Sequence, residues 1–472
     1  MSNLKDISFL TLRQQINLIK NKTVSSVELC KFYIEKIHRL NKKYNCFISI
    51  NDKESLQKAK SIDQKINKKD LSKEELLGIP ISVKDVIHTK NIRTTFGSVI
   101  HKNFIPKSDS VSVERIKNQG GIILGKTNTP EFAFGAVCEN NLVGPTLNPW
   151  DSSLSSGGSS GGSAAAVTLG LSPVSLGTDF GGSVRTPAAF CGCVGLRPTP
   201  GRIPNKDKYN AWKWLSTEGI LARNAKDAWY LLQTISGHHP QDPFSRYDSW
   251  PTLKERKERV RYAYTLDFGG AYEVDSEIKM LWNQTINILK KNINNLHKDY
   301  PDVSEADTSF KTLRSFNSWM NYQEIIYKHK KKLSKSFVWN VEQGKKITAK
   351  ELKRAEVTQH RIFKNFINFF SRYDILIVPS TSVLPFPNSQ KDVKIINGQK
   401  TKSIIDYLAC TYFISLVGLP SISIPSPVKY GKLPFGIQLI AKPNYEYLII
   451  KIANQLERCG FKYNKPEVDN LT

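Results

Sequence analysis

Two glycine-rich segments carry serines in a setting that could support nucleophilic chemistry. The first is Ser155 to Ala166 (SSGGSSGGSAAA), and the second is Gly177 to Arg185 (GTDFGGSVR). Glycine allows a backbone to approach a ligand closely, so N–H groups in such segments can surround an oxyanion or a phosphate. The first segment has the composition of a flexible linker, but a linker would not run directly into an apolar Ala-Ala-Ala-Val stretch. We therefore expect two packed turns that carry serines.

Two common sites built on such turns do not fit. A Walker-type phosphate loop ends in Gly-Lys-Ser/Thr, which neither segment contains. Residues 157–161 match the Gly-x-Ser-x-Gly nucleophile elbow, but an elbow follows an apolar strand, and residues 151–156 are polar or small except for one leucine. None of the eight histidines lies in a motif that indicates a catalytic base. A lysine that loses its proton near neutral pH is another base that a serine nucleophile can use.

A third segment completes a recognisable pattern. Gly78 to Asp85 (GIPISVKD), then residues 157–166, then Gly177 to Arg202, closely resemble the amidase signature family in order and spacing. The resemblance extends over nearly the whole chain and is weakest over residues 250–350. It implies an α/β fold with one large, mixed, twisted β-sheet, covered by helices on both faces in a single compact domain.

The resemblance also implies which residues react. Carried over position by position, it makes Ser183 the nucleophile, Ser159 the bridging serine and Lys84 the terminal base. It implies a cis peptide bond before the bridging serine, which makes Gly158-Ser159 the candidate. Lys84 would accept a proton relayed through Ser159 from Ser183, and an acyl-enzyme would form and be hydrolysed. No metal ion or organic cofactor is implied.

The neighbours of the nucleophile are expected to support it. Asp179 and Arg185 flank the turn and are interpreted as fixing it through hydrogen bonds. Ser160 and Ser163 are interpreted as helix caps. Because they lie in a glycine turn before a helix, four backbone N–H groups are expected to hold the oxyanion. These are the groups of Phe180, Gly181, Gly182 and Ser183.

The elements that must position these residues alternate between strands and helices. Ile79, Ile81 and Val83 alternate with polar or small residues, which predicts a strand with Lys84 on its opposite face. Further along the chain, the pattern predicts a helix capped by Ser110, a strand at 122–124, a helix at 163–169, a strand at 174–176 and a helix from about 183. This alternation indicates α/β layering.

The chain divides into four parts of one amidase domain over residues 1–472. Residues 1–75 are predicted to form an N-terminal helical layer, in which Ser25 and Glu28 are spaced as the capping box of a helix at 24–40. The other predicted parts are a signature core at 76–210, a helical insertion or cap at about 250–370, and C-terminal strands and a helix at 371–472. Within the last part, strands are expected at 374–378, 421–425 and 435–441, and a helix at 444–458.

Composition limits the location and partners of the protein. Seven scattered cysteines fit neither a disulfide framework nor a zinc site. No apolar run could span a membrane, and the N-terminus lacks a secretory signal. A cytoplasmic protein is therefore predicted. The net charge of +26 is spread along the chain and interleaved with acids, so the charge pattern does not favour a nucleic-acid partner. The expected partner is a small-molecule amide, and no contact with a membrane is expected. The sequence leaves open whether the chain forms a homodimer.

Two members of the family remain as alternatives. One is a free-standing hydrolase of small amides, and the other is the glutaminase subunit of a tRNA-dependent amidotransferase, which would bring a tRNA partner. Residues 128–132 (NTPEF) are typical of general amidases, and Cys410 stands where the amidotransferase subunit has an acid that holds the glutamine amino group. The sequence therefore favours the free hydrolase. Residues 250–350 and 134–138 are the candidates for an acyl pocket.

Overall fold

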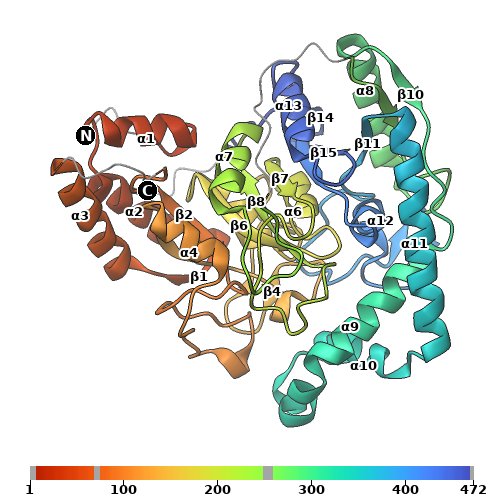
Figure 1. Cartoon of the computed structure of the whole chain (residues 1–472), viewed down its shortest axis with the longest axis horizontal. Coiled ribbons are helices and arrows are strands. Elements are labelled where there is room, and N and C mark those ends of the chain that lie inside the picture. Colours follow the sequence, from red (N-terminus) through yellow and green to blue (C-terminus); the bar gives the residue numbers. More distant parts are fainter. Residues whose placement is uncertain (1–6, 69–74, 248–258, 468–472) are drawn as a thin grey trace.

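The centre of the molecule is a long mixed sheet with helices on both faces (Figure 1). The computed structural model describes residues 7–68, 75–247 and 259–467. Within these residues the sheet has 11 strands. In spatial order they are β1 (Phe47–Ile50), β3 (Ile122–Thr127), β2 (Pro80–Lys84), β6 (Val174–Asp179), β8 (Thr217–Ala222), β7 (Val194–Arg197), β14 (Ser421–Tyr430), β15 (Leu433–Ile440), β11 (Ile375–Pro379), β9 (Tyr262–Tyr264) and β10 (Leu296–Lys298).

The direction of the strands brings two chemically important ends together. β2 lies parallel to both β3 and β6, so the carboxyl ends of β2 and β6 meet at one edge of the sheet. From β6 through β8, β7, β14, β15 and β11 the neighbours are antiparallel. Every residue of β2 is buried, as expected for a strand covered on both faces. Lys84 and Asp179, the last residues of β2 and β6, therefore end at the same edge.

Helices surround the sheet and extend the molecule at both ends (Figure 1). They are α1 (Leu12–Lys20), α2 (Ser26–Tyr44), α3 (Asp52–Asn67), α4 (Val111–Asn118), α5 (Gly161–Thr168), α6 (Arg185–Cys191), α7 (Ala225–Ile235), α8 (Ser276–Asn292), α9 (Ala306–His329), α10 (Lys335–Glu342), α11 (Ala349–Arg372), α12 (Ala409–Leu416) and α13 (Glu446–Glu457). Helices α1 to α3 lie at one end, and α9 to α11 lie at the other.

Short elements complete the structure. Two small hairpins pair β4 (Glu139–Asn140) with β5 (Gly144–Pro145), and β12 (Ile395–Ile396) with β13 (Gln399–Lys400). The 3-10 turns are η2 (Ile7–Phe9), η3 (Val99–His101), η4 (Glu131–Ala133), η5 (Lys330–Lys332), η6 (Gln343–Lys346) and η7 (Asp406–Leu408). No helix in the described ranges is both long enough and apolar enough to cross a membrane.

Most predicted elements are found close to their predicted positions. The capping box of α2 is present, because the Glu28 N–H donates to Ser25 Oγ at 3.1 Å and the Ser25 N–H donates to Glu28 Oε2 at 2.8 Å. Ser110 stands at the N-cap of α4, but its hydroxyl does not cap the helix and lies 3.2 Å from Ser112 Oγ. The fold class is confirmed.

The predicted helical insertion differs from the structure in one respect. Helices α8 to α11 fill most of residues 276–372, but the same part of the chain also supplies β9 and β10 to the edge of the main sheet. Each strand has only three residues, too few to produce an alternating pattern that can be recognised in sequence. The predicted start of the insertion near residue 250 lies outside the described residues.

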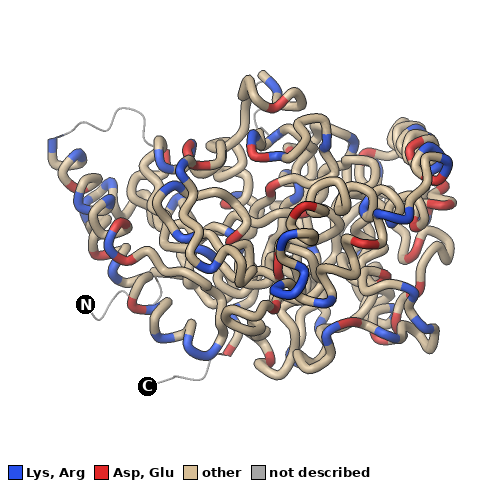
Figure 2. Tube along the Cα trace, turned by 90° about the horizontal axis from the view of Figure 1, so that it is seen from below, with Lys and Arg blue, Asp and Glu red and all other residues tan. Residues whose placement is uncertain are grey.

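Charged side chains are distributed over the surface. Figure 2 shows Lys and Arg spread along the trace and interleaved with Asp and Glu. The densest run, Lys330 to Lys332, forms an exposed 3-10 turn, and Lys330 pairs with Glu342. The seven cysteines are all free, and six of them are buried.

Candidate active site

Lys84 is a buried amine at the end of β2. Its side chain is fully inaccessible to solvent, and Nζ donates hydrogen bonds to three hydroxyls. The acceptors are Ser159 Oγ at 2.7 Å, Ser160 Oγ at 2.9 Å and Thr178 Oγ1 at 2.8 Å. Burial lowers the pKa of Lys84 from 10.5 to about 7, against smaller opposing effects of Cys138 and Asp179. Near neutral pH this amine can therefore either donate or accept a proton.

Ser159 lies in the glycine-rich loop that leads into α5. The Gly158-Ser159 peptide bond is cis, the bond that the sequence resemblance singled out. Gly158 packs directly on the chain around Ala136, since a Cβ built on it would lie 2.8 Å from the Ala136 carbonyl carbon. A side chain at residue 158 would push these two segments apart. The loop thus holds Ser159 against Lys84 through close backbone packing.

The predicted capping roles of Ser160 and Ser163 are wrong. Ser160 occupies the N-cap position of α5, but its hydroxyl binds Lys84 and donates to Thr178 O at 3.2 Å instead of capping the helix. Ser163 lies inside α5, where its hydroxyl contacts Thr127 Oγ1 at 2.6 Å. The helix begins at Gly161, earlier than the sequence predicted, and this places Ser163 within the first turn. Ser160 keeps its supporting role, but as a ligand of the lysine.

Ser183 lies in the turn between β6 and α6. Its carbonyl accepts a hydrogen bond of 3.1 Å from the Ser160 N–H, which joins the two serine-bearing turns. Ser183 and Ser159 both line one cavity. In the described part of the chain, however, no hydrogen bond joins their two hydroxyls. The structure thus brings Lys84 and Ser159 into contact and places Ser183 beside them at the same cavity.

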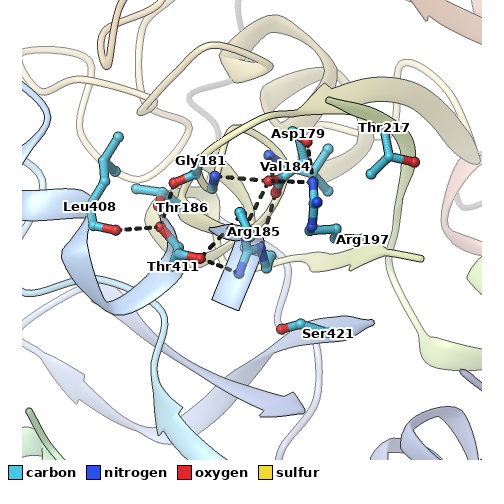
Figure 3. Close-up of polar contacts among 12 residues, drawn as sticks. Asp179, Gly181, Val184, Arg185, Thr186, Arg197, Thr217, Leu408, Thr411 and Ser421 are labelled. Atoms are coloured by element: carbon cyan, nitrogen blue, oxygen red, sulfur yellow. Dashed lines mark hydrogen bonds and ion pairs between the residues drawn. The ribbon is translucent and has the colours of Figure 1, made fainter. Parts of the chain in front are cut away.

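A buried ion cluster fixes the turn of residues 180–184, called the nucleophile turn below because Ser183 is the predicted nucleophile (Figure 3). The Asp179 carboxylate accepts hydrogen bonds from the N–H groups of Gly182 at 2.8 Å and Val184 at 3.1 Å. Arg185 binds both carboxylate oxygens, at 3.0 Å through Nε and 2.9 Å through Nη2. Burial alone would raise the pKa of Asp179, but Arg185 and Arg197 outweigh it and hold that pKa well below its usual range. Asp179 therefore stays ionised and orders the turn.

The ion cluster reaches distant parts of the chain. Arg185 Nη1 donates to the Thr411 carbonyl at 2.9 Å and to Gln438 Oε1 at 3.0 Å, and Nη2 donates to Ser415 Oγ at 2.6 Å. The Thr411 hydroxyl in turn donates to the Gly181 carbonyl at 2.8 Å (Figure 3). Helix α12 and strand β15 thus contact the nucleophile turn through specific hydrogen bonds.

The predicted set of oxyanion donors needs one correction. The Gly182 N–H is directed at the Asp179 carboxylate, so it is not available to a ligand. Gly182 also has a φ of +124°, and a Cβ there would lie 2.1 Å from Thr411 Oγ1, which explains why this position suits glycine. In the described residues, the N–H groups of Phe180, Gly181 and Ser183 have no protein acceptor. Three of the four predicted donors are therefore free to bind an oxyanion.

The cavity above these residues has a volume of about 510 Å³. Its floor includes Ser159, Thr178 and Ser183. Two walls supply most of the remaining lining, which is completed by Val86, Ile87, His88, Phe96, Ser110, Ile405, Leu408 and Tyr412. One wall, called the aromatic wall below, is formed by the 132–136 loop and α9 and carries four aromatic rings beside polar side chains of α9. A second wall is polar and is formed by the 205–218 segment. This volume is in the range of sites for small organic ligands.

Sequence reasoning missed two polar residues at this cavity. Thr178 precedes Asp179 at the end of β6, and nothing in the sequence indicated that it contacts Lys84. Arg314 lies on α9 and lines the cavity, but nothing in the surrounding sequence distinguishes it from other arginines of amphipathic helices. In the described ranges, no cluster of three or more His, Cys, Asp or Glu side chains could hold a metal ion.

Known proteins resemble the chain over nearly its full length. The Amidase family matches residues 28–450. A Glutamyl-tRNA(Gln) amidotransferase subunit from Sulfurihydrogenibium sp. (strain YO3AOP1) is 31% identical, over 97% of this chain and 99% of the relative. The subunit of the same name from Prochlorococcus marinus (strain NATL2A) is 32% identical, over 98% of this chain and 99% of the relative.

Solved structures share the fold. A bacterial aryl acylamidase of the amidase signature family superposes with a TM-score of 0.88 at 23% identity, covering 95% of this chain and 96% of that enzyme. The corresponding Glutamyl-tRNA(Gln) amidotransferase subunit from Thermotoga maritima gives a TM-score of 0.78 at 24% identity, covering 98% and 99% of the two chains. Together with the family match, these similarities show that the chain belongs to the amidase signature family, whose members hydrolyse amide C–N bonds.

Proposed function

We propose that this chain cleaves a carboxylic amide through an acyl-enzyme, with Ser183 as the nucleophile, Ser159 as the relay and Lys84 as the base. The strongest support is the 2.7 Å hydrogen bond between the buried Lys84 amine and the Ser159 hydroxyl, at the floor of a cavity that Ser183 also lines. A surface lysine would remain protonated at neutral pH and could not act as a base. Burial changes this, because it disfavours the ammonium form.

The reaction begins with Lys84 in its neutral form. Lys84 takes the proton of the Ser159 hydroxyl, Ser159 takes the proton of the Ser183 hydroxyl, and the Ser183 oxygen bonds to the amide carbon. This relay requires a hydrogen bond between the Ser183 and Ser159 hydroxyls, both of which belong to residues that line the cavity. Catalytic hydrogen bonds of this kind commonly tighten only when substrate is bound.

Charge then develops on the former carbonyl oxygen. The N–H groups of Phe180, Gly181 and Ser183 are the donors available to stabilise it. The Lys84 ammonium returns its proton through Ser159 to the leaving nitrogen, the C–N bond breaks, and ammonia or an amine departs. Water then attacks the acyl-Ser183 ester, which releases the carboxylic acid and restores the Ser183 hydroxyl.

The curated relatives favour one biological setting for this reaction. Those that match nearly the full chain at 29–32% identity are named as subunits of Glutamyl-tRNA(Gln) amidotransferase. We therefore place the glutaminase subunit of such an amidotransferase first, which reverses the order that the sequence alone favoured. In this setting the chain would release ammonia from glutamine for use on a tRNA-bound substrate, and its partners would include further subunits.

One observation favours a free-standing amidase as the second candidate. Cys410 stands where the resemblance leads us to expect an acid for the glutamine amino group, and its side chain is fully buried. Burial raises the pKa of the Cys410 thiol to about 12, so this thiol supplies no negative charge at neutral pH. An ammonium group bound near it would lack the counter-charge that such a subsite provides.

Substitution of Ser183 tests the proposed chemistry. Ser183→Ala should reduce kcat/KM for any amide that the wild-type chain hydrolyses by about 10,000-fold or more, because no acyl-enzyme can form. A matched control is Ser156→Ala, which removes a buried hydroxyl from the adjacent loop that donates to the Thr146 carbonyl at 3.0 Å. Retention of wild-type turnover by Ser183→Ala would reject the assignment.

A substrate panel separates the two settings. Purified chain is assayed on glutamine and on small neutral amides, alone and together with the other amidotransferase subunits of the same organism. A glutaminase rate that rises when those subunits are added supports the amidotransferase setting. Full activity on neutral amides, with no response to the added subunits, supports the free hydrolase.

A further inference from the structure

The aromatic wall of the cavity contains one guanidinium that has no acidic partner in the described part of the chain. This group belongs to Arg314, which lies on α9 and lines the cavity. Among the described residues, the guanidinium donates a hydrogen bond of 3.0 Å from Nη1 to Asn340 Oδ1 and contacts the ring of Phe134, whose centroid lies 5.3 Å from Cζ. Both partners are electrically neutral. Burial lowers the pKa of Arg314 to about 10, so the group remains charged at neutral pH.

Other enclosed arginines of this protein are used differently. Arg185 makes five hydrogen bonds that include both oxygens of Asp179, and Arg223 donates to three backbone carbonyls. These contacts give each buried guanidinium the hydrogen-bond acceptors that a charge removed from water needs. Within the described residues, Arg314 has Nε and Nη2 left over for a ligand. Among these residues, Arg314 therefore makes fewer hydrogen bonds to the protein than Arg185 or Arg223.

The position of Arg314 relates it to the nucleophile turn. Phe310 lies four residues earlier on α9, hence on the same helix face and about 6 Å away along the axis. A Cβ built on Gly181 would lie 3.0 Å from Phe310 Cζ, and the Phe310 ring lies 5.6 Å from that of Phe180. Arg314 is therefore about one helical turn from the oxyanion donors.

A second path leads to the same place. Phe134, the ring beneath the guanidinium, belongs to the loop that also contains Ala136, against which Gly158 packs next to Ser159. The rings around Phe134 are those of Tyr322 and Phe337, at centroid distances of 5.4 Å and 5.3 Å. The acyl chain of a substrate extending from Ser183 along this wall would thus pass aromatic surface and reach one cation.

The acids of the cavity come from another wall. Asp207 and Glu218 belong to the 205–218 segment, whereas α9, α10 and the 132–136 loop surround Arg314. His88 Nδ1 lies 3.6 Å from Asp207 Oδ1. Burial raises the pKa of Glu218 to about 7, so this carboxyl is only partly ionised near neutral pH. The segments that surround Arg314 contribute no acidic side chain to the cavity lining. An anion beside Arg314 would therefore meet no repelling carboxylate, and a cation there would find no counter-charge.

From this arrangement we infer that the acyl part of the substrate carries a carboxylate, which Arg314 binds through Nε and Nη2 while the amide carbon lies at Ser183. A guanidinium offers two parallel N–H donors that match the two oxygens of a carboxylate. The substrate class is thus the monoamide of a dicarboxylic acid or a related anionic amide. This inference rests on the proposed function for the position of the amide, but the binding of the carboxylate does not depend on turnover.

The experiment therefore measures binding in a chain that cannot react. Calorimetry on Ser183→Ala compares succinamate, glutaramate and adipamate with the neutral amides of equal chain length, butanamide, pentanamide and hexanamide. We expect at least one monoamide to bind roughly 10- to 100-fold more tightly than its neutral counterpart, as for a hydrogen-bonded ion pair. In Ser183→Ala/Arg314→Gln this ratio should fall to about one, and Arg314→Lys should restore part of it.

A matched control uses an arginine outside the cavity. Arg361 lies on α11 and pairs with Asp302 at 3.1 Å, so Ser183→Ala/Arg361→Gln should keep the full preference for the monoamide. Monoamides that bind no better than neutral amides in Ser183→Ala, or a preference that survives Arg314→Gln, would overturn the inference. If the wild-type chain hydrolyses amides but shows no preference for those with a carboxylate, this inference is wrong and the proposed function stands. If Arg314 binds the carboxylate but the wild-type chain hydrolyses no amide, the proposed function is wrong and this inference stands.

Discussion

The floor and the aromatic wall of the cavity are built in different ways. The floor consists of short turns next to strand ends, in which Lys84, Asp179 and Arg185 are fully buried and hydrogen-bonded to defined partners. The wall consists of aromatic rings from distant segments and a guanidinium that keeps free donors within the described part of the chain. Under the proposed function, the floor determines the chemistry and the wall determines the choice of substrate, so that changes in one should leave the other intact.

Among substitutions that leave Ser183 in place, removal of the proposed base should have the largest effect, and this effect should be confined to the chemistry. Lys84→Arg keeps a cation that can bind the surrounding hydroxyls, but a guanidinium does not lose its proton near neutral pH. We expect kcat to fall by about 1,000-fold or more, measured by ammonia release under saturating substrate. The relative affinities for different amides should stay the same. If they change along with kcat, the floor and the wall are not independent.

Removal of the central carboxylate should show how the floor is held together. Asp179→Asn leaves Arg185 and Arg197 as buried cations without their counter-charge, which should lower the free energy of unfolding by about 3 to 5 kcal/mol in urea denaturation. The control Asp302→Asn breaks an exposed pair with Arg361 and should change stability by less than about 1 kcal/mol. Equal effects of the two substitutions would mean that the cluster does not stabilise the turn.

The pH profile should give the smallest but most specific effect. Because the proposed base Lys84 must be neutral and burial lowers its pKa to about 7, kcat/KM should rise with pH, with a midpoint at about pH 7, and level off about one pH unit higher. Thr178→Val removes one acceptor of the Lys84 ammonium, which should lower this midpoint. The control Thr168→Val removes a hydroxyl that donates to the Cys191 carbonyl at 3.2 Å and should leave the midpoint unchanged. A profile that falls between acid and neutral pH would contradict a lysine base.

The parts that sequence predicted well depend on local patterns. The cap of α2 and the strand that ends at Lys84 follow from residues close together in the chain, and the family resemblance supplied the cis bond at Gly158-Ser159. Gly182 was misassigned as an oxyanion donor because the direction of its N–H depends on the buried Asp179 carboxylate.

Contacts between distant segments were the features that sequence could not supply. Arg314 reaches the cavity only because α9 packs over the nucleophile turn, and its sequence neighbours carry no sign of this. The three-residue strands β9 and β10 join the sheet through pairing with each other and with β11, which their own composition does not indicate. In each case the information lies in the tertiary packing.

The hydrogen bonds that bind Arg185 and Gly181 to Thr411 and Gln438 link the turn that carries Ser183 to segments that are synthesised 226 to 253 residues later. A ribosome-bound chain from which α12 and β15 have not yet emerged carries all the reactive side chains but lacks the groups that hold their turn. Amide cleavage should therefore require that both segments have been synthesised, so that chains truncated before α12 should be inactive even though they contain Lys84, Ser159 and Ser183.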